Sequence, residues 1–302
     1  MPARGRGALT PAAPVDTVAV VTAPRELDPS TGLRPGDHVC WSFDGAADLA
    51  GAVVAHLDEG RRRGEQLLLV GGPRAALLDL LADLPHRDAL LDSGQLGLQA
   101  TGDPSAAWSG LVPLEQVGRY RAAVQEALDG GRTGLRVVAD VTALVRAGRP
   151  GRRRLHAYEG LVDTFMGTVP MTGLCLYDRS VGADALGPVA VLHPVQHLGD
   201  RQPLAHLSGR GRRLALHGEV DTTEAAHVRT ALVDLAGELP AGLPGEVVLD
   251  VSDLDFLDVA GGRALEGARS DLAGSGIGLR LTGARRHVRR CLDLFDLVAE
   301  PA

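Results

Sequence analysis

Short apolar runs alternate with helical stripes along most of this chain. The run 38–43 is typical of a buried strand, and behind it Leu49, Val53 and Leu57 recur at the spacing of one helical face. The continuous apolar run 67–70 then predicts a central strand, which ends at a Gly-Gly-Pro sequence. Because strands and helices alternate in this way, we expect an α/β protein with a mostly parallel sheet.

The alternation continues to the C-terminus with one interruption. Further strands are predicted at 135–139, 173–177, 214–216, 247–251 and 277–281, and further helices at 114–128, 156–166, 225–239, 262–273 and 284–295. Between 181 and 213, Gly, Pro and His residues break the pattern, which places a domain boundary near residue 205. The predicted organisation is a disordered leader at 1–33, a first domain at 34–198, a linker at 199–206 and a second domain at 207–300.

The amino-acid composition excludes several classes of function but says little about the fold. The chain has 302 residues, 45% of them hydrophobic, and a formal net charge of −7, so we expect two globular domains and no nucleic-acid binding. All 31 basic residues are Arg, which excludes a P-loop phosphate lysine and a Schiff-base lysine. No apolar run approaches the ~20 residues of a membrane helix, so no membrane segment is expected. Three scattered Cys residues favour a reduced, cytoplasmic setting without a disulfide framework.

The second domain carries two recognisable motifs. The first is Leu-His-Gly-Glu-Val-Asp at 216–221, and the second is Leu-Asp-Val-Ser at 249–252 followed by Phe-Leu-Asp-Val-Ala-Gly at 256–261. Together with the order of the predicted elements, they resemble the STAS domain of anti-sigma-factor antagonists. The resemblance implies a small β/α domain that presents the loop 256–261 to a partner, an anti-sigma factor or a related regulatory protein.

That loop departs from the family pattern at its centre. Members that switch by phosphorylation carry Ser or Thr within Asp-Ser-Ser-Gly or Asp-Ser-Thr-Gly, and the matching residues here are Asp258, Val259, Ala260 and Gly261. Unpaired backbone N–H groups at a helix start would stabilise a phosphate, but Ala260 has no hydroxyl to carry one. We therefore expect these four residues to contact a partner without a phosphoswitch, or to serve only as a βα connection.

Six short motifs run through the first domain. They are Gly-Asp-His-Val-Cys at 36–40, Glu-Gly and Gly-Glu within 59–65, Ser-Gly-Gln at 93–95, Gly-Leu-Arg-Val at 134–137, Tyr-Glu at 158–159 and Cys-Leu-Tyr-Asp at 175–178. They resemble the MEDS family of sensory domains, named after methanogens, methylotrophs and the DcmR regulator. The resemblance implies a role in sensing small organic, hydrocarbon-like molecules.

The spacing of elements in the first domain is also similar to that of a RecA-type ATPase core. In such an ATPase, the connection after the first strand holds a phosphate-binding Gly-x-x-x-x-Gly-Lys-Thr loop. The connection 42–48 of this chain instead contains Asp44 and Asp48, whose carboxylates repel phosphate. We therefore expect a degenerate RecA-like, mostly parallel sheet with helices, with neither nucleotide hydrolysis nor a cofactor.

Five residues are predicted to line a ligand site near the strand ends: His38, Cys40, Glu159, Cys175 and Asp178. Ligands gather at the carboxyl ends of parallel strands, and the two-residue spacing of His38 and Cys40 puts both side chains on one face of their strand. These groups also suit a metal, but one His-x-Cys pair fills only half of a tetrahedral site, and buried Cys is common core filler. We predict a small organic ligand here and no metal.

Three further histidines, His193, His197 and His206, lie between the two domains. They fall in the Pro-interrupted segment and have no neighbouring Cys. We therefore interpret them as part of a linker rather than as metal ligands.

The favoured function is a non-enzymatic signalling regulator that acts by protein–protein interaction, in which a MEDS-type sensor controls a STAS-type domain without a phosphoacceptor. Two alternatives stay open: an enzyme that uses His38, Glu159 and Asp178, and a dimerisation scaffold. A solvent-open cleft with convergent titratable groups would favour the enzyme, and an enclosed apolar cavity near Cys40 and Cys175 would favour the sensor. The sequence also leaves a homodimer open.

Overall fold

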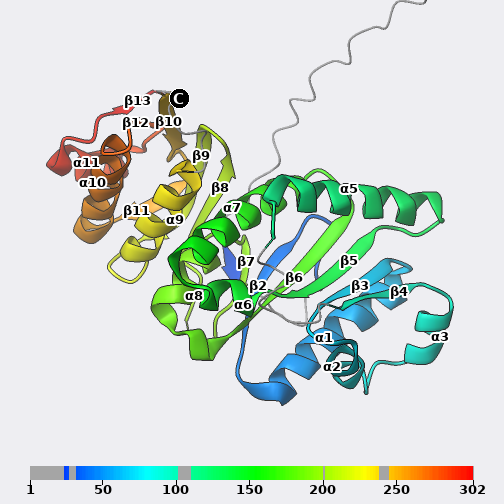
Figure 1. The fold of residues 1–302 in the computed structure, drawn as a ribbon. Helices are drawn as coiled ribbons and strands as arrows, with labels where there is room; N and C mark the ends of the chain where they lie inside the picture. The colour runs from blue at the N-terminus through cyan, green and yellow to red at the C-terminus, as the bar shows by residue number, and fades with distance from the viewer. Residues whose placement is uncertain (1–23, 27–31, 101–109, 200, 238–244, 302) are drawn as a thin grey trace, which may run out of the picture.

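The computed structural model describes residues 24–26, 32–100, 110–199, 201–237 and 245–301. They form two α/β domains, which pack against each other along one side (Figure 1). The sequence patterns had predicted both domains and their class.

The first domain is built on a seven-stranded sheet whose neighbouring strands all run parallel. Its strand order is β1-β7-β2-β6-β5-β3-β4. The strands are β1 (Arg25–Glu26), β2 (His38–Phe43), β3 (Gln66–Gly71), β4 (Leu96–Ala100), β5 (Leu135–Asp140), β6 (Met171–Asp178) and β7 (Val195–His197). The central strands are buried on both faces, which explains their continuous apolar character.

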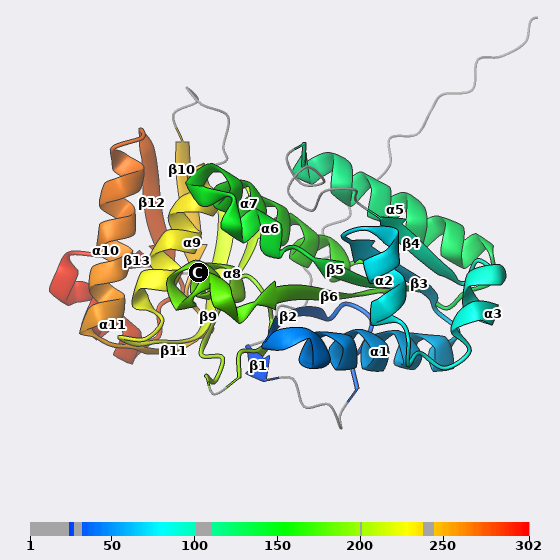
Figure 2. The same cartoon turned by 60° about the horizontal axis from the view of Figure 1, so that its bottom comes forward.

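Helices cover both faces of this sheet, and two separate hydrophobic cores lie beneath them (Figure 2). One face carries α1 (Gly45–Arg63), α2 (Arg74–Leu80) and α3 (Arg87–Asp92), and the other carries α5 (Pro113–Asp129), α6 (Thr142–Arg146), α7 (Gly148–Met166) and α8 (Ala183–Ala190). A short 3-10 turn, η1 (Arg179–Val181), follows β6. Helix α1 ends at Gly64, which takes a left-handed conformation with a φ of 73° that glycine adopts without strain.

The second domain has six strands around a single core. They are β8 (Ala205–Arg210), β9 (Arg213–Val220), β10 (Gly245–Asp250), β11 (Leu254–Leu257), β12 (Ile277–Thr282) and β13 (Ala299–Glu300). The path β11-β9-β10-β12-β13 is parallel, and β8 pairs with β9 in an antiparallel hairpin. The helical segments are α9 (Ala225–Gly237), α10 (Val259–Ala273), α11 (Arg286–Leu292) and the 3-10 turn η2 (Asp293–Phe295).

The segment 181–213 differs most from its sequence pattern. It contains α8, the three-residue strand β7 and the strand β8, although Gly, Pro and His obscure all three in the sequence. Helix α7 also begins eight residues earlier than its apolar stripe. The helix can include Pro150 because this residue lies in the first turn, where a missing N–H costs little.

Two predicted boundary segments contain ordered elements. Within the predicted leader, Arg25–Glu26 forms β1 and pairs with β7, whereas residues 1–23 and 27–31 lie outside the described residues. Within the predicted linker 199–206, β8 already begins at Ala205, and residue 200 lies outside the described part.

The two domains share a continuous packed interface between α7 and α8 on one side and α9 and β8 on the other (Figure 1). His156 of α7 contacts Asp234 of α9 at 2.8 Å in a buried pair. Gly160 allows the two helices to approach closely, because a Cβ there would lie 2.8 Å from a methyl group of Leu235. Contacts this close indicate that the second domain is docked on the first.

The backbone crosses the same boundary. The N–H of Leu207 in β8 donates to the carbonyl of Val191, just after α8, at 2.6 Å. Val191 and Leu192 belong to the hydrophobic core of the second domain although they precede it in the chain. In the described part of the chain, no helix is both long and apolar enough to cross a membrane.

Candidate functional site

Four buried side chains from four different segments converge inside the first domain. They are His38 of β2, Glu159 of α7, Cys175 of β6 and His193, which lies between α8 and β7. One nitrogen, oxygen or sulfur atom from each lies within 4.8 Å of the other three. We call these four residues the tetrad.

The local sequence explains how the tetrad is placed. Strands β2 and β6 are parallel neighbours in which His38 is opposite Gly173, and Cys175 follows two residues later on the same face. Gly173 leaves room for this arrangement, because a Cβ there would lie 3.8 Å from the His38 ring and 2.3 Å from Met166. Glu159 comes from the sheet-facing side of α7, which is buried around it.

The distances within the tetrad are short. His38 Nε2 lies 3.2 Å from Glu159 Oε2 and 3.4 Å from Cys175 Sγ. Glu159 Oε2 is also 3.7 Å from Cys175 Sγ and 3.7 Å from His193 Nε2. Glu159 Oε2 therefore lies at the centre of the contacts, with the other three donors around it.

Three of the four side chains of the tetrad also have a polar neighbour on their outer side. Tyr177 donates its hydroxyl hydrogen to Glu159 Oε1 at 2.7 Å, and His193 Nδ1 donates to the carbonyl of Val189 at 3.0 Å. His38 Nδ1 lies 3.5 Å from Asp163 Oδ1. These outer contacts hold the side chains in the orientation that turns their remaining atoms toward one another.

The surroundings shift the pKa values of the two anionic members in opposite directions. Burial alone would raise the pKa of Glu159, but hydrogen bonds from His38 and Tyr177 and the positive charge of His38 lower it below its usual value. Burial and the charge of Glu159 raise the pKa of the Cys175 thiol to about 11. Without a further positive charge, Glu159 is therefore ionised and Cys175 is a neutral thiol at pH 7.

The two histidines also differ. Burial and the charge of His38 lower the pKa of His193 to about 3, so its ring is neutral at pH 7. Burial also opposes the charged form of His38, but the groups around it, including the carboxylates of Asp163 and Glu159, raise its pKa well above the usual value. Because His193 Nδ1 donates to a carbonyl, the hydrogen of the neutral ring is on Nδ1 and Nε2 carries a lone pair.

Asp163 links the tetrad to the second domain. One of its carboxylate oxygens contacts His38, and the other lies 3.4 Å from Nε2 of His206 in β8. The ring of His206 stacks with that of His217 in β9, whose Nε2 is 3.1 Å from the hydroxyl of Ser208. A chain of polar side chains therefore runs from the tetrad into the second sheet.

The structure brings together three of the five residues that the sequence suggested as ligand-binding: His38, Glu159 and Cys175. Cys40 is buried beside them, in register with Cys175, but its sulfur is not part of the tetrad. Asp178 lies apart at the end of β6, where it pairs with Arg146 at 2.7 Å and caps η1.

Sequence reasoning missed His193 and Asp163. His193 is followed by Pro194 and a strand of only three residues, so no periodic pattern marks it as buried. Asp163 follows Glu159 by four residues, and two carboxylates on one buried helical face were the available signal.

The start of α10 in the second domain is the other candidate site. Asp258 caps this helix, because its Oδ1 accepts from the N–H of Gly261 at 2.8 Å and its Oδ2 accepts from the N–H of Thr222 at 3.1 Å. The backbone carbonyl of Asp258 accepts from the Cys291 thiol at 3.1 Å. Asp258 therefore fixes the loop, and its carboxylate is already occupied.

Apolar side chains surround this helix start at the surface. Phe256 and Val259 are 46% and 49% exposed, although residues of these types are usually buried. Ala260 is half-buried against the domain core, and Gly261 is buried, where a Cβ would lie 2.5 Å from Leu257. Phe256 and Val259 are thus the members of this loop best placed to contact another molecule.

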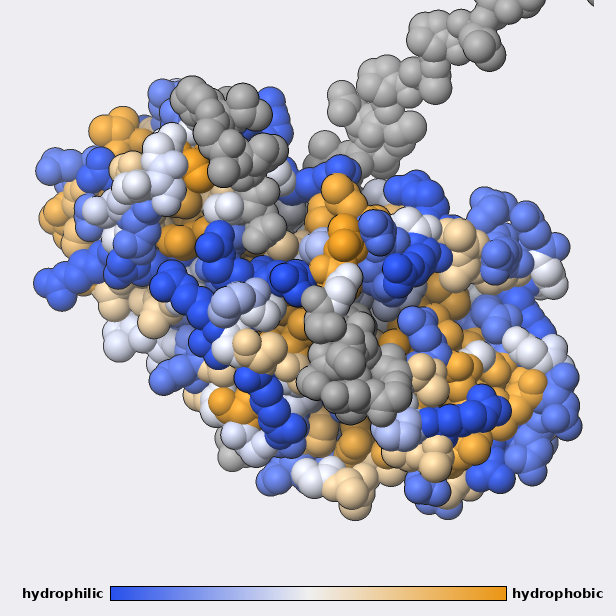
Figure 3. Space-filling view, viewed as in Figure 1, coloured by the Kyte–Doolittle hydropathy of each residue, from blue (hydrophilic) through white to orange (hydrophobic). Residues whose placement is uncertain are grey.

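The wider surface is mixed in character. On the face shown in Figure 3, hydrophilic residues are spread over both domains and hydrophobic residues lie among them. The net charge of the chain is −7.

The junction of β2 and α1 has no room for a phosphate-binding loop. Strand β2 ends at Phe43 and α1 begins at Gly45, so Asp44 alone connects them. The N–H of Asp44 is taken by the carboxylate of Asp48 at 2.9 Å. An acidic side chain therefore occupies the position at which a P-loop would present N–H groups to phosphate.

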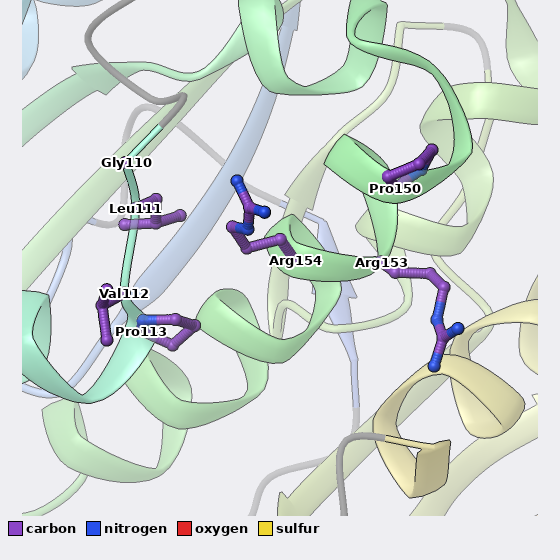
Figure 4. A pocket seen from close by; sticks show the side chains of 7 residues that line it. All are labelled: Gly110, Leu111, Val112, Pro113, Pro150, Arg153 and Arg154. Carbon is purple, nitrogen blue, oxygen red and sulfur yellow. The ribbon is translucent and has the colours of Figure 1, made fainter.

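A pocket of about 540 Å³ lies away from the tetrad, between the beginning of α5 and the first turns of α7 (Figure 4). It is lined by Gly110, Leu111, Val112, Pro113, Pro150, Arg153 and Arg154. Arg153 points toward α9, where Asp234 is 3.5 Å away, and Arg154 points toward the segment before α5 (Figure 4). None of the predicted ligand residues lines this pocket.

Comparisons with known proteins agree with the two sequence resemblances. The family model of the methanogen/methylotroph, DcmR sensory domain (MEDS) matches residues 37–194, just over half of the chain, and the STAS domain model matches residues 208–301. No curated protein matches the chain.

One similar solved structure is a crystal structure of the DUF1998 helicase MrfA bound to DNA and AMPPNP. The similarity covers 88% of this chain but only 39% of the helicase chain, at 14% identity and a TM-score of 0.28. At that score the likeness carries no argument about this protein. The two family matches, the parallel seven-stranded sheet and the separate small β/α domain show that the chain belongs to the MEDS family and carries a STAS domain behind its sensory domain.

Proposed function

We propose that this protein is a non-enzymatic signalling regulator whose STAS domain docks an anti-sigma factor or a related regulatory protein without phosphorylation of its own loop. The observation that carries this proposal is the start of α10, where exposed Phe256 and Val259 flank a position, Ala260, that has no hydroxyl. An apolar contact there needs no charge change, whereas a phosphoswitch needs an acceptor oxygen.

The input of this regulator is proposed to be the interior of the MEDS domain. The tetrad lies in a packed, fully buried environment, which favours a chemical change at its side chains over docking of an organic molecule. Asp163 supports a route to the output, because it contacts His38 of the tetrad and His206 of the STAS domain. The same burial argues against the enzyme alternative, because the side chains of His38 and Glu159 are not exposed to solvent.

The test measures binding of the full-length chain to purified kinase-type anti-sigma factors encoded in the same genome, with and without ATP. We expect Phe256→Ser combined with Val259→Ser to weaken binding at least tenfold, as removal of apolar anchors at an interface does. The matched control is Leu114→Ser with Leu128→Ser, two exposed apolar residues of α5 in the other domain, which should bind as the unchanged chain does.

Two results would overturn the proposal. One is stoichiometric phosphate within residues 252–262 after incubation with ATP and a partner that binds. The other is saturable ATP turnover by the purified chain that is lost on substitution of Glu159.

A further inference from the structure

We propose that the tetrad, His38, Glu159, Cys175 and His193, is a tetrahedral binding site for a divalent transition-metal ion of the Zn²⁺ type. The site would be closed, because all four ligands come from the protein and all four are buried. This inference is independent of the proposed docking partner, since metal binding is measured on the chain alone.

The distances between the four donor atoms suit a single ion. Zinc bonds of about 2.0–2.2 Å to nitrogen and oxygen and about 2.3 Å to sulfur place neighbouring donors of a tetrahedron about 3.3–3.8 Å apart. Four of the six separations within the tetrad are 3.2, 3.4, 3.7 and 3.7 Å, and all six lie within 4.8 Å. The donors therefore need to move by about 1 Å or less to share one ion.

His193 gives an independent indication that a partner is missing at the centre of the tetrad. Its Nδ1 donates to the Val189 carbonyl, so the lone pair on Nε2 faces the carboxylate of Glu159 at 3.7 Å. This nitrogen is fully buried and makes no hydrogen bond. Two electron-rich atoms face each other across a space with no hydrogen between them, which is unfavourable unless a cation lies there.

A metal-free hydrogen-bonded cluster explains only part of this geometry. It accounts for the contacts of His38 with Glu159 and with Cys175, since an imidazole hydrogen can be shared there. It gives no protein partner to Nε2 of His193, and a buried polar atom without a partner is costly.

The kinds of ligand select the class of metal. Two imidazoles, one thiolate and one carboxylate suit zinc, whereas Mg²⁺ and Ca²⁺ prefer oxygen ligands alone. The negative charges of Glu159 and ionised Cys175 equal the two positive charges of the ion, so the loaded site adds no net charge to the interior. Metal binding would release the proton of the Cys175 thiol and the Nε2 proton of His38, whose Nδ1 hydrogen would stay with Asp163.

The outer contacts are those that metal ligands ordinarily have. Asp163 lies beside Nδ1 of His38 and can accept its hydrogen, and the Val189 carbonyl does so for His193. Tyr177 donates to the oxygen of Glu159 that faces away from the other ligands. The His-x-Cys motif supplies one ligand, His38, and β6, α7 and the segment before β7 supply the other three.

The decisive experiment uses the full-length chain, purified without a metal-binding tag in reducing buffer from cells supplied with zinc. We expect about one equivalent of zinc per chain by mass spectrometry of the elements. After removal of the zinc, Co²⁺ should produce a thiolate-to-cobalt charge-transfer band. Cys175→Ser should abolish the band, and His193→Gln should lower the zinc content at least tenfold.

Two matched controls use the other thiols of the chain. Cys40→Ser changes a buried Cys on the neighbouring strand, and Cys291→Ser changes a half-buried Cys of the STAS domain, so both should keep the zinc and the band. If Cys175→Ser fails to fold, His193→Gln and the cobalt spectrum of the unchanged chain decide the question. Absence of bound metal together with no cobalt band would overturn the proposal, and so would a band that depends on Cys291.

Discussion

Two buried polar clusters lie in the MEDS domain, and they differ in how completely their atoms are paired. In the first, Arg136 of β5 is fully buried, donates to Glu65 at 2.5 Å and lies 3.5 Å from Glu59. The helix α1 reaches it closely only because residue 60 is Gly, where a Cβ would lie 2.5 Å from the Arg136 side chain. This cluster is a complete ion pair.

The tetrad is the second cluster, and one of its buried atoms has no hydrogen-bond partner. It gathers Glu159, His38 and Cys175 around a neutral His193 whose Nε2 makes no hydrogen bond. No side-chain nitrogen or oxygen of Arg136 or Glu65 stands among the unpartnered buried atoms of the described residues. Both clusters bury charged groups, so burial of charge alone does not mark a site. What distinguishes the tetrad is that Nε2 of His193 has no hydrogen-bond partner although it lies among other metal-ligating groups.

The largest expected effect is on the complete pair. Arg136→Ala leaves Glu65 buried without its partner, so the free energy of unfolding should fall by about 3–5 kcal/mol. Urea denaturation should give the same loss with zinc and with a chelator, because this cluster holds no metal. Arg74→Ala, a change at an exposed arginine at the start of α2, is the control and should stay within about 0.5 kcal/mol. If the loss in free energy of unfolding caused by Arg136→Ala differed with and without zinc, the two clusters would not be independent.

The next effect is on the tetrad and depends on the metal. Glu159→Gln keeps the shape of the side chain but removes one anionic ligand, so the stabilisation of the chain by zinc should fall by at least about 2.8 kcal/mol, equal to a hundredfold loss of affinity. Thermal unfolding with a series of zinc concentrations measures it. The exposed Glu126→Gln on α5 should leave the zinc response unchanged. An equal response of Glu159→Gln and the unchanged chain would contradict the assignment of Glu159 as a ligand.

The smallest expected effect distinguishes two carboxylates, each of which contacts a residue of the other domain. Asp163 contacts His38 of the tetrad and His206, whereas Asp234 contacts His156 and Arg153. Asp163→Asn should weaken zinc binding by about 10–100-fold, as loss of an outer partner of a metal-bound His does. Asp234→Asn, the control, should not change zinc affinity. Competition with a coloured chelator measures both, and equal losses would show that domain docking, not the His38 contact, sets the affinity.

Much of the fold followed from patterns that the chain carries locally. Continuous apolar runs marked the central strands β2, β3, β5 and β6, and period-two alternation placed His38 and Cys40 on one face. The capping Asp258 and the missing hydroxyl at Ala260 were also legible, because a helix start has fixed requirements over a few residues.

The segment between the domains could not be predicted in the same way. Strand β7 has three residues and α8 contains Pro188, so neither repeats long enough to give a period. Their positions are set by pairing with β2 and by packing against α9, which are contacts with residues far away in the chain. His193 was therefore interpreted as part of a linker, although it is buried beside His38.

By itself, the sequence determined the class of each domain, the absence of a lysine for phosphate chemistry and three members of the tetrad. Only the tertiary structure decided that His193 completes the tetrad, that Asp178 stands outside it and that Asp163 contacts both domains. The physical reason is distance along the chain: a strand or helix start is fixed by neighbours a few residues away. The members of the tetrad lie up to 155 positions apart in the chain, and only the packed sheet brings their side chains within 4.8 Å of one another.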